Sequence, residues 1–190
     1  MGLDQFVVKV KKPLLNKRQY TSKELSSHGL NYVSVSNFES KISLYEELLP
    51  YVSKTNVECE FYDVDKMIAD YNLPNDSYIW CRWGNGNIIM RGSTYKGERV
   101  DCHFSNAEVK EKYIYTKIEP YYCWEEEEVQ YWRKNYDLQD WMYENIDGVN
   151  NCGYSVLDLD AISEINDLFD ADLPAVKPTE ARALFYHEWY

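Results

Sequence analysis

Long apolar runs and basic residues are both scarce in this sequence of 190 residues. No stretch approaches the roughly 18 consecutive apolar residues that indicate a membrane-spanning helix. The first residues also lack the charged and apolar regions of a signal peptide. Lys and Arg number 20 against 32 Asp and Glu, for a formal charge of −12. This balance argues against a protein that neutralises nucleic-acid phosphates or binds an anionic membrane surface.

Cysteine and histidine are few, and their spacing favours neither a metal site nor a catalytic pair. The five cysteines include no CxxC pair, and no short spacing gathers four zinc ligands. Cys102 and His103 are adjacent, but neighbours on a strand point to opposite faces, which makes them a poor nucleophile and base. We expect no metal, no cofactor and no catalytic residue, and we lean against an enzyme. The thiols are expected to stay reduced, as in a cytosol.

Alternation of apolar and polar residues, by contrast, is plentiful. Hydrophobic residues make up 45% of the chain, which excludes simple disorder. Gly84-Asn85-Gly86-Asn87 lies between two β-rich runs, YIWCRW (78–83) and IIMRG (88–92), and Asn-Gly is typical of a hairpin turn. No helix follows these glycines, so they do not form a nucleotide-binding loop. Alternation predicts further strands over 5–11, 31–36, 57–63, 99–104 and 113–118, with residues 14–30 as a polar loop.

Apolar residues at helical spacing predict four amphipathic helices. Asn37 is the expected cap of the first, and Ser155 with Asp158 forms a variant capping box for the last. Four glutamates at 125–128 favour a helix start there, because the helix macrodipole stabilises acids at its N-terminus. Gly148 favours the end of that helix. The predicted helices cover 37–52, 64–71, 125–148 and 155–170.

These elements predict an α+β fold: a mostly antiparallel sheet with an Asn-Gly hairpin, covered by three or four helices on one side. We expect a single acidic domain over 1–190, which is sheet-rich over 1–124, helical over 125–172 and aromatic over the tail 173–190. The last residues read LFYHEWY, and we expect them to pack against the rest of the protein because a free aromatic tail would be sticky.

A resemblance to a known family rests on the N-terminus and roughly the last third of the chain. The sequence opens Met1-Gly2-Leu3-Asp4, later reads Tyr131-Trp132-Arg133-Lys134, and continues with Trp141-Met142 and Asn151-Cys152. This pattern resembles a family of small proteins of tailed bacteriophages and prophages, which start MGLD and carry YWRK…L..WM…NC. Their tail commonly runs Phe-Phe-Phe-Gly, and LFYHEWY departs from it. The resemblance implies a phage accessory protein in the cytoplasm of a bacterial host, and such genes often encode inhibitors of host or defence proteins.

The first candidate site is Trp132-Arg133-Lys134-Asn135, where an aromatic ring, two cations and an amide are expected on one helical turn. Such a set could bind an anion or a phosphate, with Arg133 as a bidentate donor. In the alternative, Trp132 belongs to the core, and Arg133 and Lys134 pair with nearby acids of the same helix.

The second candidate site is an acidic surface on the last helix, made of Asp158, Asp160, Glu164 and Asp167. These carboxylates could copy the spacing of DNA phosphates and occupy the nucleic-acid groove of an enzyme. The alternative is the solvated face of an amphipathic helix, because the apolar stripe at 159, 162, 165 and 168 is intact. The acids form no calcium loop, since the glycine and the terminal glutamate of an EF-hand are missing.

The 18 tyrosines and 6 tryptophans are residues that dominate protein interfaces. The leading hypothesis is a phage accessory protein that binds and inhibits a host or anti-phage defence protein with a basic surface. One alternative is a nucleotide-like small-molecule binding or modifying protein with a pocket near Trp132, Arg133 and Lys134. Another is a virion or assembly component. No direct contact with nucleic acid or membrane is expected, and the oligomeric state stays open.

Overall fold

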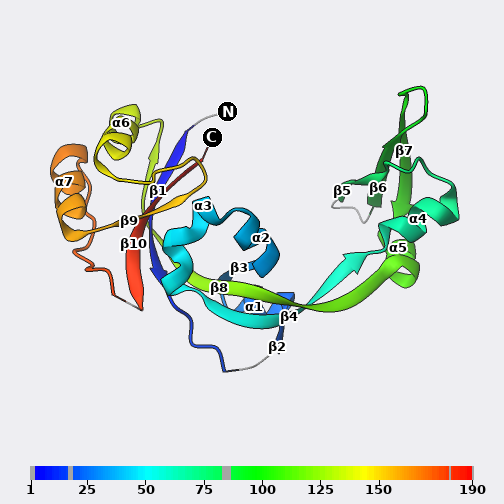
Figure 1. The fold of residues 1–190 in the computed structure, drawn as a ribbon, viewed down its shortest axis with the longest axis horizontal. Coiled ribbons are helices and arrows are strands. Elements are labelled where there is room, and N and C mark those ends of the chain that lie inside the picture. The colour runs from blue at the N-terminus through cyan, green and yellow to red at the C-terminus, as the bar shows by residue number, and fades with distance from the viewer. Residues whose placement is uncertain (1–2, 17–18, 83–86, 180, 190) are drawn as a thin grey trace. The chain divides into compact units, whose positions relative to one another are not determined.

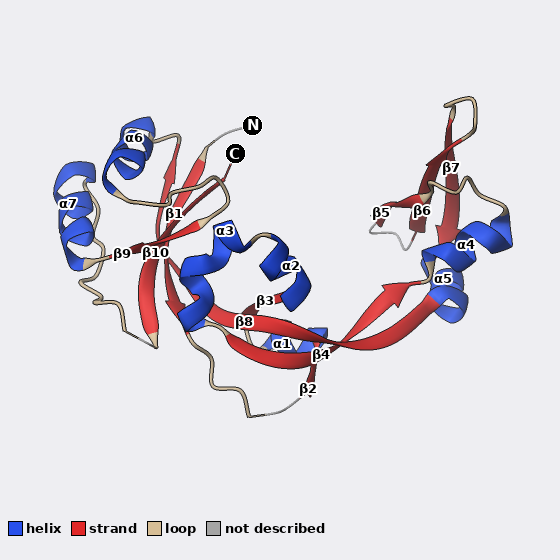
Figure 2. Cartoon of the chain, in the orientation of Figure 1, coloured by secondary structure: helices blue, strands red, loops and turns tan. Residues whose placement is uncertain are grey.

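The computed structural model describes residues 3–16, 19–82, 87–179 and 181–189, and it has the α+β fold expected from the sequence (Figures 1 and 2). The chain divides into two compact units. Unit 1 comprises Met1–Val57 and Glu119–Tyr190, and unit 2 comprises Glu58–Ile118. Strands β4 (Ser53–Tyr62) and β8 (Ile114–Arg133) contribute residues to both. The single domain over 1–190 stays a prediction, and each unit is described by itself.

Unit 1 is built on a seven-stranded sheet with the order β2-β4-β8-β1-β10-β9, in which β3 also pairs with β8. Strand β1 is antiparallel to both β8 and β10, and β10 is antiparallel to β9. The aromatic tail therefore packs against the rest of the protein, as expected, and it does so as an interior strand. The further strands are β1 (Asp4–Lys11), β2 (Gln19–Thr21), β3 (Leu30–Ser34), β9 (Tyr154–Leu157) and β10 (Arg182–Trp189).

Helices cover both faces of this sheet, not one face as expected. Adjacent residues of β10 point to opposite faces. Leu184 and Tyr186 pack under α6 (Tyr136–Asn145) and α7 (Leu159–Phe169). On the opposite face, Phe185 packs with Phe38 and Leu48, which come from α2 (Val35–Ser40) and the 3-10 helix η1 (Glu46–Tyr51). Figure 1 shows α6 and α7 on one side of β1 and β10, with α2 and α3 (Ile42–Tyr45) on the other.

The predicted helix over 125–148 is wrong in its first third, where the chain is extended as part of β8. Lys9 and Lys11 of β1 lie opposite Glu127 and Glu125 in the register, and Lys9 Nζ is 2.6 Å from Glu127. Opposite charges directly across two strands stabilise the pair. The acids thus complement a neighbouring strand and do not begin a helix, which starts at Tyr136.

The other predicted helices and their caps agree with the structure only in part. The span 37–52 is broken into α2, α3 and η1, because Lys41 leaves the helical region and Pro50 cannot donate an α-helical hydrogen bond. Its cap is Ser34, not Asn37. The expected loop over 14–30 contains β2 and α1 (Ser22–Ser27), which has a capping box. Ser155 lies in β9 and does not cap the last helix; Asp158, expected as its partner in the capping box, is itself the N-cap of α7.

Unit 2 is a three-stranded antiparallel sheet with two helices on one face. Strands β5 and β6 are the predicted hairpin partners, although residues 83–86 of its turn lie outside the described residues. Helix α4 has the predicted span Val64–Tyr71. The core combines buried side chains of both helices and the sheet, including Met67, Met90 and Val109. The elements are β5 (Tyr78–Arg82), β6 (Asn87–Ser93), β7 (Arg99–Ser105) and α5 (Asn106–Tyr113).

Across the described residues, no helix has the length and apolar character needed to cross a membrane.

Candidate functional site

The turn from β8 into α6 places the first residues of the candidate site. Lys134 adopts a left-handed conformation with φ 58° and donates its backbone N–H to Leu3. Asn135 then caps α6, because its side-chain oxygen accepts a hydrogen bond from the N–H of Leu138 at 3.1 Å. One face of α6 is held in the core by Leu138 and Met142, which are fully buried. The opposite face is left for solvent or a partner.

Buried polar contacts fix α6 on the sheet. Gln5 of β1 is fully buried, and its side chain exchanges two hydrogen bonds of 3.0 Å with the backbone of Asn135. The Gln5 amide also donates to the Tyr186 hydroxyl at 2.8 Å. These contacts join the helix cap to two central strands. These hydrogen bonds therefore hold the start of α6 in place on the sheet.

The carboxylate of Glu188 is the second anchor, and it is fully buried. It accepts hydrogen bonds from the hydroxyls of Tyr186 and Tyr143 at 2.8 Å each, and Gln139 lies at 3.3 Å. No ion pair joins it to a described residue. Burial, together with the neighbouring carboxylate, raises the pKa of Tyr186 well above its ordinary value. The network keeps Tyr186 protonated as a donor and ties α6 to β10.

Helix α7 is held next to α6 by its cap and its apolar face. Asp158 accepts a hydrogen bond from the N–H of Ala161 at 2.8 Å. Ile162 and Ile165 are buried in the same core as Leu138. Asn166 of α7 exchanges hydrogen bonds of 2.7 and 3.0 Å with the backbone of Leu173, which lies after the end of the helix. The chain after α7 is thereby folded back along the helix.

A groove of about 570 Å³ lies between α6 and α7. Its apolar part includes the rings of Trp141 and Phe169, which meet edge to face with centroids 6.0 Å apart, and Leu168, which is 61% exposed. We call this the acidic groove, because α6 contributes three carboxylates to its lining. The lining residues are Asn135, Asp137, Asp140, Trp141, Glu144, Leu168 and Phe169.

The acids of the groove share one stripe of the helix. Asp137, Asp140 and Glu144 are spaced three and four residues apart, so they lie on the same face of α6. Asp160, Glu164 and Asp167 are all exposed and have the same spacing on α7. The chain from 135 to 176 contains ten Asp and Glu and no Lys, Arg or His. No ion pair joins these acids to a described residue.

Carboxylates beside apolar side chains, as in the acidic groove, are suited to the recognition of cationic groups. Within residues 3–16, 19–82, 87–179 and 181–189, no group of three or more His, Cys, Asp or Glu side chains could hold a metal ion. An apolar floor with carboxylates along its rim can bury an aliphatic or aromatic side chain and pair with neighbouring Lys or Arg. Like charges three and four residues apart on a helix repel each other and destabilise it, so a bound cation reduces this repulsion.

The structure does not bring the four residues of the first candidate site together. Trp132 and Arg133 end strand β8, Lys134 forms the turn and Asn135 caps α6, so the shared helical turn is wrong. Trp132 packs against the core, whereas Arg133 and Lys134 are exposed. Only Asn135 of the four lines the acidic groove. Their role in ligand binding stays a prediction.

The acids of the second candidate site lie where the sequence places them, on the exposed side of α7, and Asp158 has the additional task of capping. The sequence analysis missed Asp137, Asp140 and Glu144 on α6. Their signal was the absence of basic residues from 135 to 176 together with the spacing of three and four. No family model, curated protein or solved structure matches this chain.

Proposed function

We propose that this protein is a binding protein that docks a basic, amphipathic segment of a partner protein in the acidic groove and thereby blocks the partner's own contacts. The groove itself carries the proposal, since it combines an apolar floor with three carboxylates on one helix face. In this proposal the four acids predicted on α7, Asp158 among them, add to the negative charge that attracts the partner. A partner with Lys and Arg around an apolar side chain matches both properties.

Electrostatics gives the groove a kinetic role as well. Ten acids without an intervening base create a strong local negative potential. Such a potential steers a basic partner into contact and accelerates association, and added salt weakens it. The bound state gains affinity from Trp141 and Leu168, because apolar and aromatic groups in the centre of an interface dominate its energy.

The biological setting follows the family resemblance stated for the YWRK pattern. In this proposal the protein is a phage accessory protein in the cytoplasm of a bacterial host, and the partner is a host or anti-phage defence protein with a basic surface. Inhibition would follow from occupation of that surface. Recovery of one stoichiometric partner from host extract, lost when the groove acids are neutralised, supports this setting. Detection of the protein at fixed copy number in purified virions supports an assembly component in its place.

A defined peptide tests the groove directly. The probe is a fluorescent amphipathic helix of lysine and leucine, compared with a glutamate and leucine version. Neutralising Asp137→Asn, Asp140→Asn and Glu144→Gln together should weaken binding of the lysine peptide at least about tenfold, since each charge pair contributes up to about 1 kcal/mol. Fluorescence anisotropy measures the Kd at low and high salt.

The matched control removes the same number of carboxylates from unit 2. Asp65→Asn, Glu98→Gln and Glu111→Gln change exposed acids that are remote from the groove in sequence, and they leave both proteins with the same net charge. The control should bind the lysine peptide within about twofold of the unchanged protein. If both triple variants lost the same affinity for the lysine peptide, binding would depend on net charge and not on the groove, and the proposal would be overturned.

A further inference from the structure

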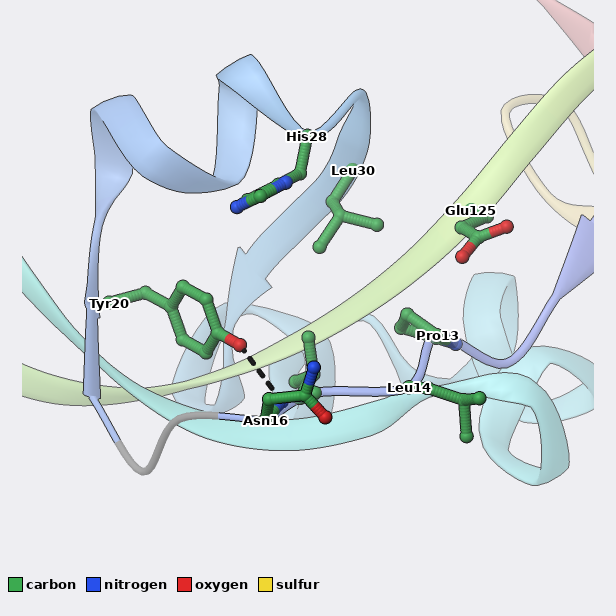
Figure 3. A pocket seen from close by; sticks show the side chains of 8 residues that line it. Pro13, Leu14, Asn16, Tyr20, His28, Leu30 and Glu125 are labelled. Carbon is green, nitrogen blue, oxygen red and sulfur yellow. Dashed lines mark hydrogen bonds between the residues drawn. The ribbon is translucent and has the colours of Figure 1, made fainter.

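A second cavity in unit 1, of about 340 Å³, lies away from α6 and α7 (Figure 3). Its walls come from the connection after β1, from β2, from the turn between α1 and β3, and from β8. The volume is within the range of small-molecule sites, which begins at about 300 Å³. Residues used in the argument are Pro13, Asn16, Tyr20, His28, Leu30 and Glu125.

The walls of the cavity offer flat, apolar surfaces. Tyr20, Leu30 and Pro13 are buried. The rings of Tyr20 and His28 meet nearly at a right angle, at 86°, with centroids 6.4 Å apart. Figure 3 shows both rings directed into one space, with Asn16 on its other side. Such a corner accommodates a planar ring, which can stack on one aromatic side chain and meet the edge of the other.

His28 is held at this corner by the local fold. Helix α1 begins with a capping box, in which Thr21 and Glu24 exchange hydrogen bonds. The helix ends at His28, whose backbone N–H donates to Glu24 and Leu25. Gly29 follows with φ 68°, a left-handed conformation that favours glycine. The turn therefore fixes the backbone of His28 at this corner of the cavity.

The cavity is lined by one side chain that only accepts hydrogen bonds, Glu125, and by others that can both donate and accept, such as Asn16. Among the described residues, the side chains of Asn16 and Glu125 have no hydrogen-bond partner, so both are available to a ligand. A carboxylate accepts from an amino group, and an amide can both accept from and donate to the edge of a purine or pyrimidine. These side chains match a heterocycle with an exocyclic amino group.

Charge next to the cavity selects against phosphate. An adjoining cleft shares His28 and Glu125 and is also lined by Glu126, Glu127, Lys9 and Lys11, so three carboxylates stand against two ammonium groups. Lys9 already pairs with Glu127 at 2.6 Å. The lining is therefore net negative, and like charges at short distance cost a phosphate free energy.

We infer that this cavity binds a neutral, amino-bearing nucleoside or free base, with the ring against Tyr20 and His28 and the amino group near Asn16 and Glu125. The site is independent of the acidic groove and of the partner proposed for it.

Titration calorimetry with adenosine, cytidine, uridine and adenosine monophosphate tests this inference on the full chain. Adenosine or cytidine should bind saturably. Uridine, which lacks the amino group, and the monophosphate should each bind at least about fivefold more weakly. Asn16→Ala and Glu125→Ala should each weaken the preferred nucleoside about tenfold, because each removes a hydrogen-bond partner.

Glu164→Ala on α7 is the control, since it removes an equally exposed carboxylate far from the cavity in sequence, and it should leave the nucleoside Kd unchanged. Glu125→Ala should also leave binding of the lysine peptide unchanged, which separates this test from that of the groove. Absence of saturable binding by every nucleoside, tighter binding of the monophosphate, or unchanged binding by both cavity variants would overturn the inference.

Discussion

In unit 2, ten acidic residues stand against eight basic ones, whereas unit 1 carries twenty-two acids against twelve bases. The best-defined carboxylate of unit 2 is paired: Asp101 accepts two hydrogen bonds from Arg91 at 2.8 and 3.0 Å, with Arg99 at 3.4 Å. The Arg91 guanidinium also lies 3.5 Å from the centroid of the Trp80 ring. In unit 1, buried Glu188 is satisfied by neutral tyrosine and glutamine groups.

The difference shows which charges serve the fold. In unit 2 a bidentate Arg–Asp pair on a small sheet fixes neighbouring strands. In unit 1 the acids of α6 and α7 have no cationic partner among the described residues, so they contribute nothing to the fold through pairing. Surplus charge that the fold does not use is available for recognition. The imbalance between the units therefore directs attention to the acidic groove.

The largest effect is expected for Glu188, the buried carboxylate that has no cationic partner among the described residues. Glu188→Ala leaves two tyrosine hydroxyls and the Gln139 amide without their buried acceptor, which should cost about 3 kcal/mol or more of unfolding free energy. Urea unfolding followed by circular dichroism measures the loss. The exposed Glu164→Ala is the control and should stay within about 0.5 kcal/mol. Similar losses for the two variants would contradict the buried network.

A smaller effect is expected in unit 2. Arg91→Ala removes the bidentate pair and the stacking on Trp80, and the cation–π contact alone contributes about 1 kcal/mol. Arg99 has a side chain that is 66% exposed, so Arg99→Ala should change stability by less than about 0.5 kcal/mol. The same urea experiment compares them. If Arg99→Ala lost more stability than Arg91→Ala, the pair of Arg91 with Asp101 would not be the main stabilising charge pair of unit 2.

The smallest effect is a difference in pH dependence between the units. Burial raises the pKa of Glu47, which accepts the backbone N–H of Val156, above its ordinary 4.5. Its contribution is present below the pKa of the unfolded chain and is lost as pH rises through the folded pKa. A hydrogen bond from Arg91 lowers the pKa of Asp101 below its ordinary 3.8. That contribution is present above the unfolded pKa and is lost as pH falls through the folded pKa.

Urea midpoints between about pH 3 and pH 7 check both directions. Relative to the unchanged protein, Glu47→Gln should gain stability as pH rises above 4.5, because the amide keeps an acceptor for Val156 without the charge. Asp101→Asn should be the less stable protein above 3.8, and the difference should shrink as pH falls below that value. If the urea midpoints of the unchanged protein and of both variants changed with pH in the same way, the predicted difference in pH dependence between the units would be wrong.

Elements governed by local spacing were predictable. Strand β1, helix α4 and the hairpin strands β5 and β6 follow from alternation or helical periodicity. The glutamates of β8 were misread because local chemistry favoured a helix start. Their true partners, Lys9 and Lys11, lie more than a hundred residues away in the sequence. The matching alternation of lysine and glutamate was visible, but nothing local pairs the two segments.

The candidate site was partly predictable for the same reason. The acids of α7 could be read from one helix, whereas the groove requires two helices to pack on the same face of a sheet. The cavity that contains His28 combines four separate segments, and no local pattern marked His28 as part of a site. Sites made from distant segments depend on strand order, which local patterns do not specify.

Composition and short-range periodicity are local properties, and they were sufficient to predict the α+β class, the acidic character and the concentration of acids between 135 and 176. The interior position of the aromatic tail and the helices on both faces of the sheet depend instead on long-range packing. The same packing buries Glu188 among tyrosines. Those outcomes depend on which strands pair over long distances, where burial and cross-strand contacts outweigh local preference.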